Sequence, residues 1–316
     1  MRAKHAFGKG AVVLVAVLLT GVVAVTTGWT SARSAAPVHL YWTNNTLAWG
    51  SKPAATTIGR ARLDGTGVEL SFLSGTGRRP CGAALDRGHI YWAEALGGEV
   101  GDPDEGGAIG RANRDGSAVN ARFIPPPNGG GCGVAIAGRH IYWSNGLTIG
   151  RARLDGTGAD GEFIRGLGIP HGWSCGIAVA GKYIYWGHAG ESLKPIATIG
   201  RANLDGTGVN KHFITGLTNG CGIAVAGGHI YWTNEGTGGG IGRANLDGTG
   251  VDQRFIRTAS RTCGVAVYGG RIYWGQSTGG FAHPLTTIGR ANLDGSAVDN
   301  QFITGIHNTC GGLAVG

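Results

Sequence analysis

Short apolar runs alternate with glycine-rich turns along nearly the whole chain, and the runs follow one another in a fixed, repeating order. In the fifth copy the runs are residues 221–226, 229–233 and 241–246, and a last run surrounds Phe255 and Ile256. Ala-Gly-Gly separates the first two runs, and Asp-Gly-Thr-Gly separates the last two. Asp-Gly between extended runs is a strong hairpin signal, because both central positions of such a turn favour positive φ. Each copy therefore predicts four short antiparallel strands.

The spacing of the copies predicts the architecture. One Tyr-Trp pair marks each copy, and the pairs recur every 42 to 51 residues. They are Tyr41-Trp42, Tyr91-Trp92, Tyr142-Trp143, Tyr185-Trp186, Tyr231-Trp232 and Tyr273-Trp274. This period fits one propeller blade. We therefore expect an all-β fold, a six-bladed β-propeller with four antiparallel strands per blade.

The two ends of the repeat region complement each other. The first copy lacks its opening run, and the chain finishes on a lone opening run from Cys310 to Val315. We expect this C-terminal strand to join the N-terminal blade, which closes the ring and leaves no unpaired sheet edge at the junction. Both hairpin turns are short in every copy, so they are expected on one face of the ring, and the variable connections on the other.

The alternation inside each run predicts which side chains share a face. In the fifth copy Ile230 and Trp232 point to one face and Tyr231 to the other, while Gly242 and Ala244 share a face. We interpret the repeated glycine of Ile-Gly-Arg as room for an aromatic ring of the neighbouring blade.

The first 36 residues differ in composition from the repeats. Arg2, Lys4 and Lys9 precede an uncharged apolar run over residues 11–28, followed by small residues. This pattern is typical of a signal peptide or an N-terminal membrane anchor. We therefore divide the chain into residues 1–36 and a propeller over residues 37–316. We expect a secreted or cell-surface protein that touches a membrane only through residues 11–28, if that segment is not cleaved.

The charge of the repeat region argues against nucleic acid as a partner. The chain has a formal charge of +8, but four bases and no acid precede residue 37, so the remainder is near +4. Six of its bases are the repeated arginines of Ile-Gly-Arg, and no Lys/Arg run interleaves with aromatic residues.

The repeated residues resemble the YWTD repeats of the low-density lipoprotein receptor family, also called class B repeats. The shared pattern is Gly-[Ile/Leu]-Ala-Val, Ile-Tyr-Trp and Ile-x-Arg-Ala-x-Leu-Asp-Gly, and it covers the chain from residue 38 onward. The resemblance implies a six-bladed propeller that binds proteins without catalysis, here in a bacterial-type exported member. One departure affects function. The final Asp of YWTD is replaced in every copy, by Asn44, Glu94, Asn145, His188, Asn234 and Gln276.

The six cysteines occupy the same place in every repeat and must form a ring. They are Cys81, Cys132, Cys175, Cys221, Cys263 and Cys310. A disulfide needs Cα atoms roughly 4.4–6.8 Å apart, so only neighbours in the ring can pair. Two patterns remain open: 81 with 132, 175 with 221 and 263 with 310, or 132 with 175, 221 with 263 and 310 with 81. Buried thiols copied by duplication are the alternative to disulfides. A metal site using His171 and His307 is a third interpretation, and we expect no metal.

Function is expected where the repeat is broken, on the loop-rich face. The candidate ligand-binding residues there are Trp49, Glu94, Trp173, His188, Asn234, Phe281 and His283. We expect a monomeric, non-catalytic scaffold that binds a protein, peptide or glycan and needs no cofactor. One alternative is a channel-centred hydrolase or lactonase-like enzyme, although Cys-Gly occupies the inner-strand starts where such enzymes place metal ligands. A structural cell-surface domain held by an uncleaved anchor is the other alternative.

Overall fold

The computed structural model describes residues 37–44, 56–77, 80–94, 107–125, 132–167, 174–188, 196–218, 220–234, 239–258, 260–277, 287–306 and 312–316. The chain divides into two compact units, Met1–Ala36 and Pro37–Gly316. The first unit lies outside the described residues, so its assignment as a signal peptide or anchor stays a prediction. Among the described residues no helix is long and apolar enough to cross a membrane.

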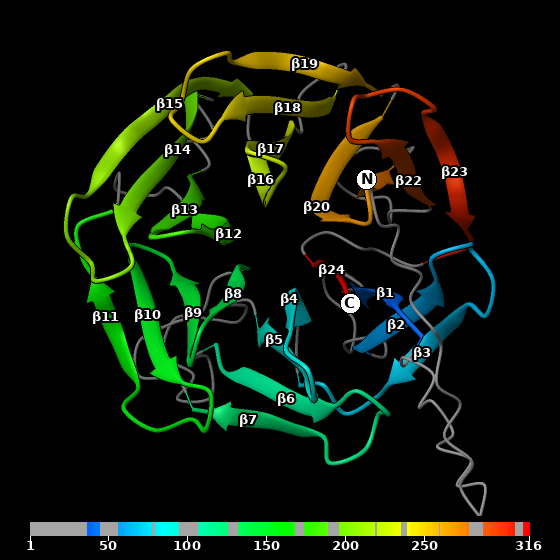
Figure 1. Ribbon diagram of the computed structural model, residues 1–316. Helices are drawn as coiled ribbons and strands as arrows, with labels where there is room; N and C mark the ends of the chain where they lie inside the picture. The colour runs from blue at the N-terminus through cyan, green and yellow to red at the C-terminus, as the bar shows by residue number, and fades with distance from the viewer. Residues whose placement is uncertain are drawn as a thin grey trace, which may run out of the picture. The chain divides into compact units, whose positions relative to one another are not determined.

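The described strands form six four-stranded antiparallel sheets arranged around a centre, which confirms the predicted all-β, six-bladed propeller (Figure 1). From the inner to the outer strand, blade 1 is β24 (Leu313–Val315), β1 (His39–Asn44), β2 (Thr57–Arg62) and β3 (Glu69–Leu73). Blade 2 is β4 (Pro80–Leu85), β5 (His89–Glu94), β6 (Ile109–Asn113) and β7 (Asn120–Ile124). Blade 3 is β8 (Val134–Ala137), β9 (His140–Asn145), β10 (Thr148–Arg153) and β11 (Asp160–Ile164).

The other three blades repeat this order. Blade 4 is β12 (Ser174–Ala180), β13 (Tyr183–His188), β14 (Ile196–Asn203) and β15 (Asn210–Thr218). Blade 5 is β16 (Gly220–Ala226), β17 (His229–Asn234), β18 (Gly240–Asn245) and β19 (Asp252–Arg257). Blade 6 is β20 (Arg261–Tyr268), β21 (Arg271–Ser277), β22 (Thr287–Asn292) and β23 (Asp299–Thr304).

The last strand closes the ring as predicted. β24 pairs with β1 in antiparallel register, with Trp42 opposite Leu313 and Leu40 opposite Val315. His39 and Gly316 extend the ladder by exchanging two backbone hydrogen bonds of 3.1 Å each. Blade 1 is thus built from both ends of the propeller sequence.

The two short turns of each blade lie together on one face of the ring. In blade 3 the backbone N–H of Leu154, before the outer turn, donates to the carbonyl of Arg139 in the inner turn at 3.0 Å. Equivalent bonds join Leu204 to Lys182 and Leu293 to Gly270. These bonds confirm the predicted short-turn face, which consists of the β-hairpin turns between strands one and two and between strands three and four of each blade.

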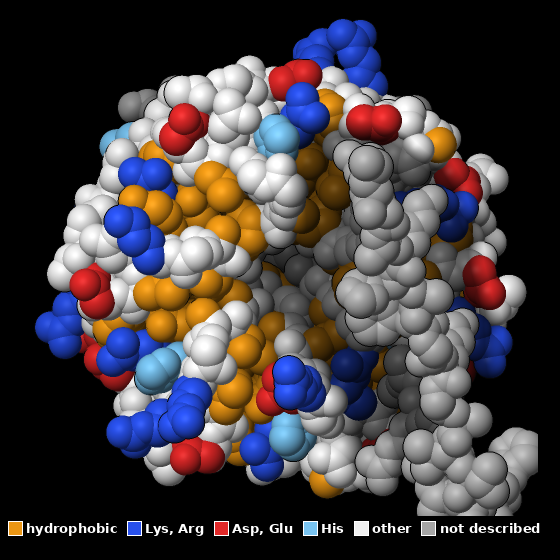
Figure 2. Space-filling view, in the orientation of Figure 1, with side chains coloured by type: hydrophobic (Ala, Val, Ile, Leu, Met, Phe, Trp, Pro, Cys, Tyr) orange, Lys and Arg blue, Asp and Glu red, His pale blue; other side chains and the backbone are white. Residues whose placement is uncertain are grey.

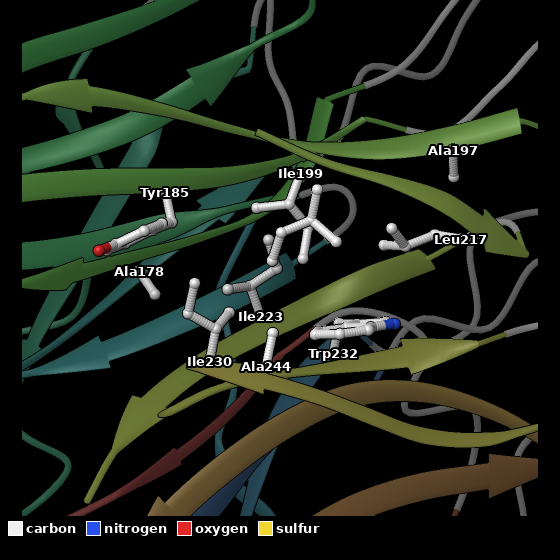
Figure 3. Close-up of a cluster of buried hydrophobic side chains, with 10 residues drawn as sticks. Ala178, Tyr185, Ala197, Ile199, Leu217, Ile223, Ile230, Trp232 and Ala244 are labelled. Atoms are coloured by element: carbon white, nitrogen blue, oxygen red, sulfur yellow. The ribbon is translucent and has the colours of Figure 1, made fainter. Parts of the chain in front are cut away.

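The core consists of separate clusters between neighbouring blades. In each cluster the Tyr face of one blade packs on the Trp face of the next. Between blades 4 and 5, Tyr185 lies opposite Trp232, with Ile199 and Ile230 between them (Figure 3). The junction of blades 6 and 1 follows the same rule, with Tyr273 against Trp42. The period-2 alternation read from the sequence therefore sets the order in which the blades stack.

The glycine of Ile-Gly-Arg does make room for an aromatic ring, but the ring belongs to its own blade. Gly150 is paired with Trp143 of the adjacent strand. A Cβ at Gly150 would overlap the Trp143 indole, and the same holds for the equivalent glycine in each blade. The predicted partner was wrong because the indole lies flat over its cross-strand neighbour in the sheet.

Candidate functional site

The loop-rich face carries the ends of the second strands, where the family's Asp is replaced. In four blades the residue there is an amide, and its side-chain nitrogen donates to a backbone carbonyl of the outer strand. These bonds are Asn44 to Leu70 (2.6 Å), Asn145 to Gly161 (3.1 Å), Asn234 to Gln253 (2.8 Å) and Gln276 to Asn300 (2.6 Å). An ionised Asp can only accept hydrogen bonds and could not make this contact. These four amides therefore tie the second strand of their blade to the fourth.

Three of the seven predicted ligand-binding residues lie in the described part of the chain. Asn234 is buried and makes the structural contact above, His188 is 3% exposed, and Glu94 is half-buried. They end the second strands of blades 5, 4 and 2; blades 5 and 4 adjoin in the ring, whereas Glu94 lies two blades away from His188. Trp49, Trp173, Phe281 and His283 lie outside the described residues. Ligand binding by these seven residues stays a prediction.

A narrow channel runs between the inner strands. Its described lining consists of Gly, Ala, Cys, Val, Ile and Leu, and the cysteine, Cys132, is held in a disulfide, so these lining residues offer no ionisable side chain. Among the described residues no group of three or more His, Cys, Asp or Glu could hold a metal ion. The described part of the channel thus presents no carboxylate, His or Asn side chain of the kind with which a hydrolase would hold a metal.

A glycine at the start of the inner strand lets neighbouring inner strands converge; it directly follows the cysteine in blade 5 (Gly222) and is the second residue after the cysteine in blade 1 (Gly312). A Cβ at Gly222 would lie 2.7 Å from the backbone nitrogen of Val265 in the next blade. A Cβ at Gly312 would lie 2.7 Å from the carbonyl carbon of Gly82. Backbone packs directly on backbone here, which only glycine permits. The signal in the sequence is the Cys-Gly that opens each complete copy, although spacing alone does not reveal the role of the glycine.

A disulfide joins two blades beside the channel. Cys81 of β4 is bonded to Cys132, just before β8, with their Cα atoms 4.7 Å apart. Cys263 is disulfide-bonded as well. These bonds rule out free thiols at the three cysteines, and the first bond belongs to the first of the two patterns left open. The side chains of Cys175, Cys221 and Cys310 lie outside the described residues, as do His171 and His307.

Blade 2 carries a polar cluster on the short-turn face. Asp86 accepts hydrogen bonds from the backbone of Gly88 (2.7 Å) and His89 (2.6 Å) and from the Tyr91 hydroxyl (2.9 Å). Burial raises the pKa of Asp86, but these bonds outweigh it and leave the pKa below its ordinary value. Burial and the Asp86 carboxylate raise the pKa of Tyr91. Asp86 is thus an ionised acceptor whose oxygens are occupied by its own hairpin.

Comparison with known proteins defines the class. No family model matches the sequence, and no curated protein does. Among solved structures, a chain of the nidogen/laminin complex is 19% identical, with a TM-score of 0.65 over 88% of this chain and 98% of that chain. The computationally designed Ika8 protein is 12% identical, with a TM-score of 0.46 over 81% of this chain and 73% of that chain. The first likeness concerns the fold alone, and the sheet topology described above makes the chain a six-bladed β-propeller.

Proposed function

We propose that this chain is an exported, non-catalytic YWTD-type scaffold that binds a protein, peptide or glycan through its loop-rich face. The proposal rests on one observation: the repeated residues that the structure describes make contacts that hold the blades together. Trp and Tyr fill the cores, the amides of Asn and Gln tie strands together, and glycines allow close approach. The sequence is free to vary in the loops of one face, which is where binding residues concentrate in such scaffolds.

The connections of that face differ widely in length. Between β9 and β10 only residues 146 and 147 intervene, whereas residues 95–108 separate β5 from β6. The short turns of the opposite face hardly vary. Because these loops are unequal, their lengths and sequences set the shape of this surface, and the propeller fold does not. A site that is specific for one ligand needs such a surface.

A protein or peptide is the favoured ligand. The similar propeller chain comes from a complex of nidogen with laminin, which supports a protein partner. Export is supported by residues 1–36 and by the Cys81–Cys132 disulfide, since such bonds persist in oxidising compartments. We propose a secreted or cell-surface location. Sequencing the N-terminus of the exported protein separates cleavage near residue 35 from retention as an anchor.

The test is a combined peptide and glycan array probed with the exported protein. We expect binding that falls at least tenfold in Trp49→Ala, Trp173→Ala or Phe281→Ala and persists in Val251→Ser, a control on an exposed outer edge. Binding that none of the loop substitutions weakens would refute the assignment of the face. A stoichiometric divalent ion together with turnover of ester or lactone substrates would instead establish the hydrolase alternative.

A further inference from the structure

We propose that the short-turn face is a second docking surface. It binds a peptide segment of a partner protein, and this segment carries both acidic and apolar side chains. The inference concerns the face opposite the loops and does not depend on the function proposed above. It rests on an apolar ring around the channel mouth, on the distribution of charge across this face, and on the rigidity of its turns.

The apolar ring comes from the ends of the inner strands. Each blade contributes a half-buried aliphatic residue there: Leu85, Ile136, Val179, Val225, Val267 and Val315. The leucine before each Asp-Gly turn adds a second half-buried residue in five blades, and in blade 2 Arg114 takes its place. Figure 2 shows hydrophobic side chains as patches between the centre and the rim, clearest at the left of the view, over blades 3 and 4. Tyr268, 41% exposed, borders the ring in blade 6.

Positive charge lies on the inner turns of three consecutive blades. Arg87, Arg139 and Lys182 are exposed at the tips of the inner turns of blades 2, 3 and 4. Blades 5 and 6 have the glycine pairs 227–228 and 269–270 at these tips. The exposed cations at the turn tips therefore form an arc over blades 2 to 4, where an acidic group of a ligand would be attracted. In blade 6 the half-buried Arg271 follows the glycine pair.

Negative charge lies further out. The outer turn of each blade carries one exposed aspartate: Asp64, Asp115, Asp155, Asp205, Asp247 and Asp294. In blade 4, Asp205 accepts hydrogen bonds from the hydroxyl and the backbone N–H of Thr207, and these bonds lower its pKa. The inner acid, Asp86, is occupied by its own hairpin. A narrow acidic peptide over the inner arc avoids the outer acids, whereas a flat anionic membrane would meet all of them.

The surface is also held in place before any ligand arrives. Each described inner turn is bonded to the outer turn of the same blade, as in the 2.9 Å bond from Leu204 to the Lys182 carbonyl. A surface that is already ordered loses little conformational entropy on binding. Apolar contact, a cationic arc and a rigid backbone together match a short peptide with both acidic and apolar side chains.

The test is a selection from a displayed library of random dodecapeptides on the full-length protein. We expect enriched peptides rich in Asp or Glu with Leu or Phe between them. Their affinity, measured by fluorescence polarisation, should fall at least tenfold in the triple variant Arg87→Gln, Arg139→Gln, Lys182→Gln. Tyr268→Ser should weaken them as well. A matched triple variant of exposed outer-strand cations, Arg122→Gln, Lys211→Gln, Arg254→Gln, should bind as the parent does.

Three outcomes would overturn the proposal. The first is no enrichment, or enriched peptides without acidic residues. The second is equal binding by the parent and the inner-turn triple variant, with matching melting temperatures as proof of folding. The third is sedimentation with phosphatidylserine vesicles that the same triple variant abolishes, because this would assign the cationic arc to a membrane.

Discussion

A close neighbour requires glycine at one place in every blade and at a second place in blades 1, 2 and 5. In the third strand, Gly150 and its equivalents lie under the indole of their own blade. In the inner strand, Gly222 and Gly312 face the backbone of the next blade. The first place explains the glycine of Ile-Gly-Arg, and the second explains the glycine just before the aliphatic residue of the inner strand, so both have physical causes that do not involve a ligand.

Gly150→Val tests the first contact. The new side chain would overlap the indole of Trp143, which is 3% exposed and has no room to move, so we expect a loss of about 3 kcal/mol or more. The measurement is the melting temperature, which should fall by roughly 10 °C. Gly88→Ala is the matched control, because its Cβ would meet only the Asp86 carboxylate at 3.8 Å. Equal melting temperatures for Gly150→Val and the parent would contradict this account.

Asn234→Asp tests the amide contact. At neutral pH the new carboxylate would face the Gln253 carbonyl in a buried place, which we expect to cost about 1–3 kcal/mol. The carboxyl would be protonated more easily than in the unfolded chain, so its raised pKa makes the loss smaller as the pH falls. Denaturant unfolding between pH 4 and pH 8 measures both effects. Asn245→Asp, where the exposed amide donates to the Thr249 hydroxyl, should change little.

At the scale of elements, two kinds of blade alternate around the ring. Blades 1, 3 and 5 have a hydroxyl after the Tyr-Trp pair, at Thr43, Ser144 and Thr233, while blades 2, 4 and 6 have Ala93, Gly187 and Gly275. The Ser144 and Thr233 hydroxyls accept bonds of 2.8 Å from the backbone of Gly133 and Gly222. In blades 2 and 6 the glycine after the cysteine has positive φ instead, 67° at Gly82 and 64° at Gly264. The Cys81–Cys132 bond runs from one kind of blade to the other.

This alternation predicts the remaining disulfides. If every even blade is bonded to the next odd blade, the pairs are Cys175–Cys221 and Cys263–Cys310. Peptide mapping by mass spectrometry without reduction should find these two crosslinks together with Cys81–Cys132. A crosslink between Cys221 and Cys263, or a free thiol after denaturation, would show that the threefold pattern does not extend around the ring.

The strands were predictable from the sequence, whereas the contacts that decide their details were not. Asp-Gly turns and Tyr-Trp pairs are local signals, so they gave the strand order, the blade count and the closure by β24. The partner of Gly150 depends on the tilt of an indole across the sheet, which no spacing encodes. The amide contacts of Asn234 and its equivalents were missed for a similar reason, since their acceptors lie two strands away. Consequently, a residue placed among the ligand candidates proved to make a structural bond.

At the scale of the whole molecule, stability depends on closing the last junction. Leu313 is buried in the cluster that joins blades 6 and 1, where it lies with Trp42 and Tyr273. Without β24, this cluster opens and the inner edge of β1 loses its partner. The remaining junctions do not need β24, yet the ring they form would have a gap.

Deleting residues 310–316 tests the closure. We expect cooperative unfolding at a clearly lower temperature, because one blade loses its inner strand and one core cluster is exposed to water. Leu313→Ala serves as a graded comparison, with a smaller loss of about 2–5 kcal/mol. Calorimetry of the three proteins measures the difference. A truncated protein that melts like the parent would refute the role of β24.

The pairing of β1 with β24 also determines when during folding the ring can close. Strands whose residues lie at 39–44 and 313–315 must meet, so the ring cannot be completed until almost the whole chain is present. A chain that emerges N-terminus first from the ribosome keeps blade 1 incomplete until β24 has emerged. The unfinished sheet exposes an edge during that time and is open to association with other chains. The β1–β24 pairing that stabilises the finished ring therefore also leaves the ring open to aggregation while it is being assembled.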